Sequence, residues 1–290
     1  MLVSQTFAQS TNAAEIVLNS DSFKQGDTIE VLIKDDSSKK TGSTDGDGSA
    51  GGTDATAGAA LQEVHFIDRS YKVFPLKAGQ ADGAVGKALI GVNALQKPGK
   101  FTLKYGDQEK TVTIAAGMFG VQVLSLPKGK DNFISSPGEE ETVQKAKATL
   151  TPHQYWLGQF LKPSQARTSS PYGVRRRVNG KLLPDYFHSG QDFAGAIGSP
   201  ITACANGKVI ISKWGWRLHG NTVAIDHGQG VVSFYIHMSK ILVKEGDMVS
   251  AGQKIGLIGA TGRASGPHLH FSLYVNNNAV NPWNWFHKSF

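Results

Sequence analysis

Two histidines stand two residues apart in an apolar run, in the stretch GPHLHFSL at residues 266–273. Successive side chains of a β-strand point to opposite faces, so His268 and His270 would share one face. Their Cα atoms would lie about 6.6 Å apart, which lets both rings approach one point. Buried imidazoles need partners for both nitrogens. The pair therefore indicates either two hydrogen-bonded core histidines or a site for an ion.

Two further clusters could contribute to the same site. His188 and Asp192 lie four residues apart in HSGQDF, and His237 ends the strand-like stretch SFYIHMS. Fully extended, His188 and Asp192 would be about 13 Å apart, but Gly190 between them permits a bend. Taken singly, the first pair also fits a surface turn, and His237 also fits an ordinary residue at the end of a strand.

Together these clusters favour a metal centre. Histidine nitrogens and a carboxylate form a donor set that zinc prefers, and a catalytic zinc uses three protein ligands with a fourth position open. Four good candidates are present, so one of them would stand beside the ion and transfer protons. The candidates are His188, Asp192, His268 and His270.

The elements that would position these residues are mainly β-strands. From residue 166 to the end the chain is punctuated by glycines and rich in β-formers, and KEGDMVSAGQKIG at 244–256 predicts a hairpin. In the N-terminal part, Ile29, Val31 and Ile33 alternate with polar residues, as in a half-buried strand. Strand signals recur there about every ten residues, which predicts a small β-sandwich. The stretch 95–114 predicts a hairpin that turns at Gly106 and Asp107.

The intervening segments have a different character. Residues 1–14 and the low-complexity stretch 37–60 cannot build a core, so we expect a disordered tail and a disordered loop. In SSPGEEETVQKAKATL, at 135–150, Ser136 is a candidate N-cap and Pro137 would lie in the first turn. The predicted fold class is therefore mainly all-β, with a short helix in a linker at 119–165.

Composition narrows the functional classes. The chain of 290 residues carries a net charge of +7, which favours anionic partners such as a cell-wall polymer, or reflects a basic surface. GVRRRVNGK is the single basic block and lacks interleaved aromatics, so nucleic acid is not expected as a partner. Cys204 is the only cysteine, which excludes an internal disulfide, and no apolar run reaches the 18 residues of a membrane span.

The C-terminal motifs resemble a known family. The H-x-x-x-D of HSGQD, the Y-x-H-M-S of YIHMS and the H-x-H of HLH, which follows GATGRASGP, are similar to those of lysostaphin/LytM-type peptidoglycan metallo-endopeptidases. The resemblance runs from about 178 to 285. It implies an antiparallel β-sheet peptidase domain that holds one Zn²⁺ through His188, Asp192 and His270. It places His237 and His268 as catalytic residues beside a metal-activated water, the nucleophile.

The resemblance also implies a function and a domain scheme. Residues 15–118 are similar to an immunoglobulin-like domain that precedes the peptidase domain in some bacterial members, and 166–290 would form the peptidase domain. We expect a zinc-dependent endopeptidase that hydrolyses stem peptides or cross-links of peptidoglycan. The alternative is a non-catalytic wall-binding or amidase-activating protein of the same fold. The expected location of such an exported enzyme is the periplasm or cell envelope. The N-terminus is not a full signal peptide, although FAQS has the small residues of a cleavage region.

Four other residues have open roles. Trp214, Trp216 and His219 could line a peptide groove or could simply pack, whereas His227 in a turn is interpreted as structural. The N-terminal module could restrain the active site until it is removed or displaced. The sequence does not identify a regulatory partner. D-Ala–diaminopimelate and oligoglycine bonds both remain possible substrates, and we favour the former.

Overall fold

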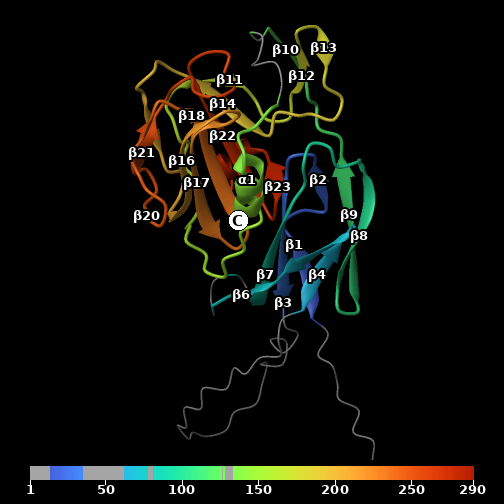
Figure 1. Ribbon diagram of the computed structural model, residues 1–290. Coiled ribbons are helices and arrows are strands. Elements are labelled where there is room, and N and C mark those ends of the chain that lie inside the picture. The colour runs from blue at the N-terminus through green and yellow to red at the C-terminus, as the bar shows by residue number, and fades with distance from the viewer. Residues whose placement is uncertain (1–13, 35–61, 78–80, 82, 126, 128–132) are drawn as a thin grey trace, which may run out of the picture.

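The computed structural model describes residues 14–34, 62–77, 81, 83–125, 127 and 133–290. The predicted disordered tail, apart from Ala14, and the predicted disordered loop 37–60 lie outside these residues. Two β-rich parts lie side by side, one drawn in blue to teal and the other in yellow to red (Figure 1). The fold is mainly all-β, as predicted.

Two sheets make up the N-terminal part and enclose one hydrophobic core. Ile29, Val31 and Ile33 all point into that core, which confirms the predicted half-buried strand. The predicted hairpin is also present, because β8 and β9 pair antiparallel up to Tyr105 and Gln108. The immunoglobulin-like character of this part stays a prediction. One sheet has the order β1 (Glu15–Leu18), β3 (Thr28–Lys34), β7 (Ala84–Gly91), β6 (Phe74–Pro75); the other has the order β2 (Ser22–Lys24), β9 (Gln108–Ala115), β8 (Gly99–Tyr105), β4 (Glu63–Phe66), β5 (Arg69–Lys72).

An eight-stranded sheet is the centre of the C-terminal part, and its hydrogen-bonded neighbours are antiparallel. The register of β14 against β22 sets Asp192 opposite His270 and Ala194 opposite His268. This pairing brings two of the candidate clusters together. In order, the strands are β11 (Arg167–Ser170), β14 (Gly190–Ala194), β22 (His268–Val275), β18 (Val231–Met238), β17 (Gly220–Gly228), β16 (Gly207–Trp216) and β20 (Met248–Val249), with β23 (Asn278–Val280) also paired to β22.

Two small sheets flank the large one. The predicted hairpin at 244–256 does not form, because β20 pairs with β16 whereas β21 pairs with β15 and β19. In these separate pairings, Val249 of β20 and Ile255 of β21 are both buried in the main C-terminal core. The small sheets are β15 (Pro200–Thr202), β21 (Lys254–Leu257), β19 (Lys240–Ile241), and β10 (Val121–Leu124), β12 (Arg175–Val178), β13 (Lys181–Leu182).

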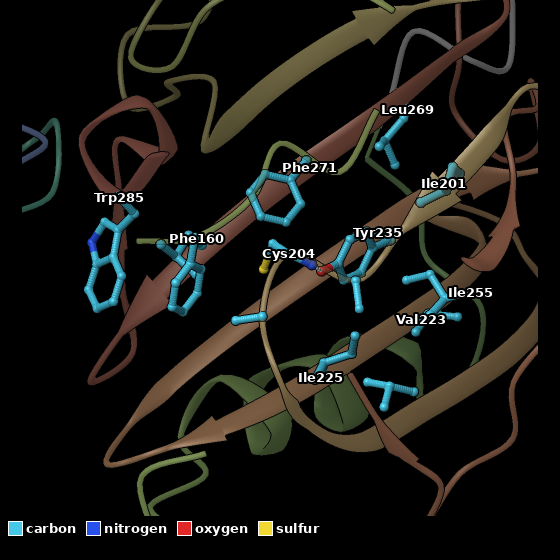
Figure 2. Packing of buried hydrophobic residues seen from close by; sticks show 14 of the residues in the cluster. Phe160, Ile201, Cys204, Val223, Ile225, Tyr235, Ile255, Leu269, Phe271 and Trp285 are labelled. Carbon is cyan, nitrogen blue, oxygen red and sulfur yellow. Dashed lines mark hydrogen bonds between the residues drawn. The ribbon is translucent and has the colours of Figure 1, made fainter. Parts of the chain in front are cut away.

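The main core covers one face of the large sheet. Leu269 and Phe271 of β22 are fully buried there and pack near Tyr235 of β18 (Figure 2). Because side chains alternate along β22, His268 and His270 point to the opposite face. The predicted division of this strand into an apolar face and an imidazole face is therefore confirmed.

Helix α1 (Glu139–Lys147) packs on that opposite face through Val143 and Ala146. The predicted N-cap at Ser136 is wrong, because the helix begins at Glu139 after Gly138, which has a φ of 72°. The Ser136 hydroxyl accepts instead from the backbone N–H of Arg217. A second helix, α2 (Pro282–His287), begins with an Asn281 cap. Neither helix within the described residues is long and apolar enough to cross a membrane.

The N-terminal sheets contact the C-terminal part at the far end of β22. Asn276 donates to the Leu89 carbonyl at 2.7 Å, and Trp285 donates to the Thr28 hydroxyl at 3.0 Å. An eight-residue strand spans about 23 Å or more, so these contacts lie far from His268 at the start of β22.

We propose the predicted division into residues 15–118, 119–165 and 166–290 as the domain organisation. The middle segment does more than connect the other two. It carries α1 and also contributes Trp156 and Phe160 to the main C-terminal core. It therefore folds together with the C-terminal part.

A buried polar network crosses the main core. His227 is fully buried, its Nδ1 contacts the Asn206 carbonyl at 2.7 Å, and its Nε2 contacts the Ser233 hydroxyl at 2.7 Å. Cys204, 3.6 Å from that Nε2, is fully buried, and burial raises its pKa to about 12. The thiol is therefore inert, and the buried His227 ring supports the structural role expected for it.

Acid should destabilise the metal-free protein through His227. Burial lowers the pKa of His227 from 6.5 to about 4, so the unfolded chain binds the extra proton between these values. Stability should therefore rise from about pH 4 to 6.5 and level off above, with about 3 kcal/mol coming from this residue. Urea unfolding at pH 5 and pH 7 measures the difference. His227→Gln should shrink it, whereas His153→Gln, at an exposed position, should not. An unchanged pH dependence in His227→Gln would contradict this assignment.

Candidate metal centre and active site

Three donor atoms converge at the end of the large sheet. His188 Nε2 lies 2.9 Å from Asp192 Oδ1 and 2.8 Å from His270 Nδ1, and His270 Nδ1 lies 2.8 Å from the same carboxylate oxygen. All three residues are buried. The structure therefore brings the three proposed metal ligands together.

Neighbouring elements hold each ligand in place. Asp192 on β14 faces His270 on β22 across the antiparallel pair, and His188 lies in the loop before β14. The backbone N–H of His188 donates to the Val174 carbonyl, and its own carbonyl accepts from Gly173. Gly190 is already part of β14, opposite Ser272, rather than at a bend before it, and it packs too closely on the Phe271 carbonyl to carry a side chain.

Hydrogen bonds to residues outside the cluster show which ring nitrogen of each histidine carries the proton. His188 Nδ1 lies 2.8 Å from the Pro171 carbonyl, so this nitrogen carries the proton and Nε2 keeps a lone pair. His270 Nε2 lies 2.7 Å from the Ser272 hydroxyl, which can accept its proton and leave Nδ1 as the free donor atom. Such outer partners orient metal-binding histidines and make them better ligands.

The pKa shifts of Asp192 and His270 favour the protonation states in which these side chains bind a metal. Burial alone would raise the pKa of Asp192, but His188 and His270 hold it well below its usual value. Burial lowers the pKa of His270 to about 4, although Asp192 opposes this shift. At neutral pH the site therefore offers an ionised carboxylate and a neutral imidazole, the states that metal binding requires.

The donor set fits a zinc ion. Three lone-pair-bearing atoms in mutual contact repel one another unless a cation or shared protons lie between them. Two nitrogens and one carboxylate oxygen form a three-ligand set of the catalytic type, and all ligand atoms lie within 4.8 Å of one another. The side of the cluster that faces His237 and His268 opens into a groove.

His237 and His268 stand beside this cluster with their rings 4.9 Å apart. His237 Nδ1 lies 2.9 Å from the Thr261 carbonyl, and His268 Nδ1 lies 2.8 Å from the Gly266 carbonyl. Both Nδ1 atoms therefore carry protons, which leaves both Nε2 atoms as bases. His268 Nε2 is 3.9 Å from Asp192 Oδ1. Burial, followed by the nearby histidines, lowers the pKa of His237 well below 6.5, so it is neutral at pH 7.

The backbone of His237 is unusual. Its φ of 65° lies in the left-handed region that residues with a Cβ rarely adopt. Its N–H leaves the regular ladder and donates to the His219 carbonyl at 3.0 Å. Strain of this kind costs about 1–3 kcal/mol and persists only where the surroundings enforce it, often at functional sites.

A groove of about 280 Å³ runs over the site. We call it the groove; its residues include Gln122 and Leu124 of β10 and Arg176 of β12 as well as the metal and catalytic candidates. Neither Trp214 nor Trp216 lines it, so the packing alternative holds for Trp216, which lies against the apolar cluster under α1. Among the described residues that line the groove, none precedes Gln122, so the N-terminal sheets do not cover it.

Glu139 is a supporting residue that sequence reasoning missed. Its fully buried carboxylate accepts from the backbone N–H groups of Ser136, Leu218 and His219, and from the His219 ring at 2.7 Å. The His219 carbonyl in turn accepts from His237. In the sequence, Glu139 is simply one of three glutamates in a first helical turn, and nothing there distinguishes it.

Removal of Glu139 should therefore impair both folding and activity. Glu139→Ala leaves several buried donors without an acceptor, which should cost about 3 kcal/mol of unfolding free energy. The loop that orients His237 would loosen, so we expect kcat to fall about tenfold or more with little change in KM. Urea unfolding and steady-state hydrolysis measure the two effects. Glu141→Ala, exposed on the same turn, is the matched control, and equal behaviour of the two variants would refute the positioning role.

Comparisons with known proteins agree with this geometry. Residues 186–282 match the sequence profile of Peptidase family M23. Over 120 residues the chain is 44% identical to the peptidoglycan DD-endopeptidase ShyA of Vibrio cholerae, a match that covers 41% of this chain and 27% of that protein. The chain thus spans about a quarter of the length of this relative.

Two solved structures are also similar. A crystal structure described as an M23 peptidase from Pseudomonas aeruginosa has 29% identity and a TM-score of 0.58, and covers 79% of this chain and 88% of its own. The catalytic domain of lysostaphin from Staphylococcus simulans has 34% identity and a TM-score of 0.37, with 42% of this chain and 92% of that domain covered. The chain therefore contains a Peptidase family M23 domain, at residues 186–282.

Proposed function

We propose that this protein is a zinc-dependent endopeptidase that hydrolyses peptide cross-links or stem peptides of bacterial peptidoglycan. One observation carries the proposal: a buried His188–Asp192–His270 cluster lies beside two histidines whose Nε2 atoms are free to act as bases. The name of the relative ShyA, a peptidoglycan DD-endopeptidase, supports the substrate class.

His188, Asp192 and His270 would hold the ion. Bound there, a zinc ion supplies Lewis acidity, which lowers the pKa of water and polarises a carbonyl oxygen. Asp192 adds one negative charge to the ligand set and Arg176 lies 3.4 Å from its second oxygen. Arg176 thereby adds a positive charge beside the carboxylate, whose Oδ1 contacts with His188 and His270 orient it.

The two remaining histidines transfer the protons. The Nε2 atom of His237 or His268 accepts a proton from the attacking water as its oxygen bonds to the scissile carbonyl carbon. The protonated ring and its neighbour then stabilise the negative charge that develops on the carbonyl oxygen. As the C–N bond breaks, the same proton passes to the leaving amine. Neutral imidazoles are needed at the start, which fits the low pKa of His237.

The scissile bond is proposed to join D-Ala to diaminopimelate. Support comes from the relative named as a DD-endopeptidase, since such a bond joins two D-configured centres. A substrate in the cell wall also implies that the protein works outside the cytoplasm, in the periplasm or cell envelope. The net charge of +7 is favourable for contact with an anionic wall.

Hydrolysis of purified walls tests the proposal. Peptidoglycan sacculi are incubated with the full chain, with zinc or with a chelator, and new amine termini are quantified. We expect amines to appear with zinc, to be lost with chelator and to return when zinc is restored. If a zinc-loaded protein binds the walls but releases no amines, the alternative of a non-catalytic wall-binding protein is correct. Mass analysis of the released muropeptides identifies the bond.

A further inference from the structure

A second hollow of about 150 Å³ lies directly beside the metal ligands. We call it the side pocket. It shares Arg176, His237, Arg263 and His270 with the groove, so a substrate at the metal centre would extend into it. Its volume suits one small polar group and its immediate neighbours, not a long segment of chain.

The charged side chains described around the side pocket are positive. Among the described residues that line it, three carry cationic side chains, Lys147, Arg176 and Arg263, and none is an aspartate or glutamate. Each cation lies over an aromatic ring, at 4.8 Å for Lys147 on Tyr274 and 4.1 Å for Arg263 on Phe133. These ring contacts hold the charges in place, and the low-dielectric walls strengthen their field.

Arg176 has hydrogen-bonding capacity that the described residues do not use. Its guanidinium lies over Tyr186, and the carboxylate contact it makes within the described part of the chain, from Nη2 to Asp192 Oδ2, is long at 3.4 Å. Its Nε is buried and has no hydrogen-bond partner among the described residues. A guanidinium is permanently charged and directs its donors in a plane that matches a carboxylate. This permanent charge, beside a pocket whose described lining has no acidic residue, therefore points to an anionic ligand group.

We propose that the side pocket binds a free carboxylate of the substrate peptide, within one or two residues of the scissile bond. Lys147 and Arg176 contribute the binding charges, with Arg263 on the same wall. This inference rests on the proposed function and adds a specificity determinant to it. The carboxylate could be a side-chain carboxylate of the residue that supplies the leaving amine, or the C-terminal carboxylate of the same peptide.

Matched substrates distinguish these sources. A synthetic cross-linked peptide is prepared with all carboxylates free, with the side-chain carboxylate amidated, or with the C-terminal carboxylate amidated. For the zinc-loaded full chain we expect kcat/KM to fall about 10- to 100-fold when the recognised carboxylate is amidated, because one charge-assisted contact is lost. The amidated form that is cleaved poorly identifies the source.

Variants of two neighbouring lysines connect this preference to the pocket. In Lys147→Gln the ratio of rates between free and amidated substrates should fall toward one, whereas Lys145→Gln, exposed on the same helix, should keep the wild-type ratio. Lys147 does not contact the metal ligands, so zinc content serves as a check in both variants. A calorimetric titration with the amine-side product peptide and its amide, on zinc-free protein, adds a readout that is independent of catalysis.

The outcomes separate the two proposals. If the wild-type protein cleaves the free and both amidated substrates at equal rates, the pocket proposal is wrong and the proposed function stands. If no form is cleaved by zinc-loaded protein, the proposed function fails. In that case the product peptide must still bind the wild type more tightly than Lys147→Gln, or the pocket proposal fails with it.

Discussion

Replacement of Asp192 with alanine is expected to reduce bound zinc from about one ion per chain to nearly none, and hydrolysis by at least about 10³-fold. Its Oδ1 atom contacts both histidine donors, at 2.9 Å and 2.8 Å. The variant would retain two ligands and would leave the positive charge of Arg176 without its carboxylate. Both changes weaken the affinity for a cation in the same direction.

Metal analysis after dialysis, together with the release of amine termini from walls, measures the two effects. Asp185→Ala is a suitable control because it removes the same charge from an exposed position nearby. Near-ultraviolet circular dichroism shows whether the variant keeps its tertiary packing. A folded Asp192→Ala protein that still binds one zinc per chain would rule out the proposed ligand set.

Replacement of His237 should also abolish most activity but, unlike replacement of Asp192, should leave the zinc content unchanged. The ring is not among the converging donor atoms, and its Nε2 is proposed to take and return the proton. Loss of a general acid–base group usually lowers kcat by about 10²- to 10⁴-fold. We expect His237→Asn to fall in this range while its zinc content stays near one per chain.

The choice of asparagine follows from the backbone. At a φ of 65°, asparagine is among the better-tolerated residues, so the variant separates lost chemistry from added strain. His268→Asn, at the neighbouring ring, tests whether the two histidines act as a unit. If they do, kcat of the double variant should be only slightly lower than kcat of the less active single variant. Loss of zinc in His237→Asn would instead make this residue a ligand, and unchanged kcat would remove it from the reaction.

The position of the N-terminal sheets bears on regulation. They bond to the far end of β22 and to α2, and the described residues that line the groove all come from Gln122 onward. Within the described part of residues 15–118, the structure therefore contains no segment that covers the site. The elements beside the groove are β10, β12 and α1, which belong to the segments on either side of the proposed linker boundary.

Local patterns were sufficient to predict part of this protein. The alternation in HLHF predicts which face of β22 is apolar and which carries imidazoles, because a two-residue period is imposed by the strand itself. The same reasoning holds for Ile29 to Ile33 and for the hairpin at 95–114. Family-like motifs also pointed to His188, Asp192 and His270, which the structure brings together, and to the neighbouring His237 and His268. Their roles in metal binding and proton transfer stay predictions.

Other features depend on residues that are distant in the sequence. Asp192 meets His270 across 78 residues only because the register of β14 on β22 aligns them, and register follows from which side chains the whole sheet can bury. Arg176 looked like part of a solvated basic run, and Glu139 like one acidic residue of a helix start. Their contacts with Asp192 and His219 arise when separate segments pack together. No local period encodes that packing, so the tertiary structure alone decided it.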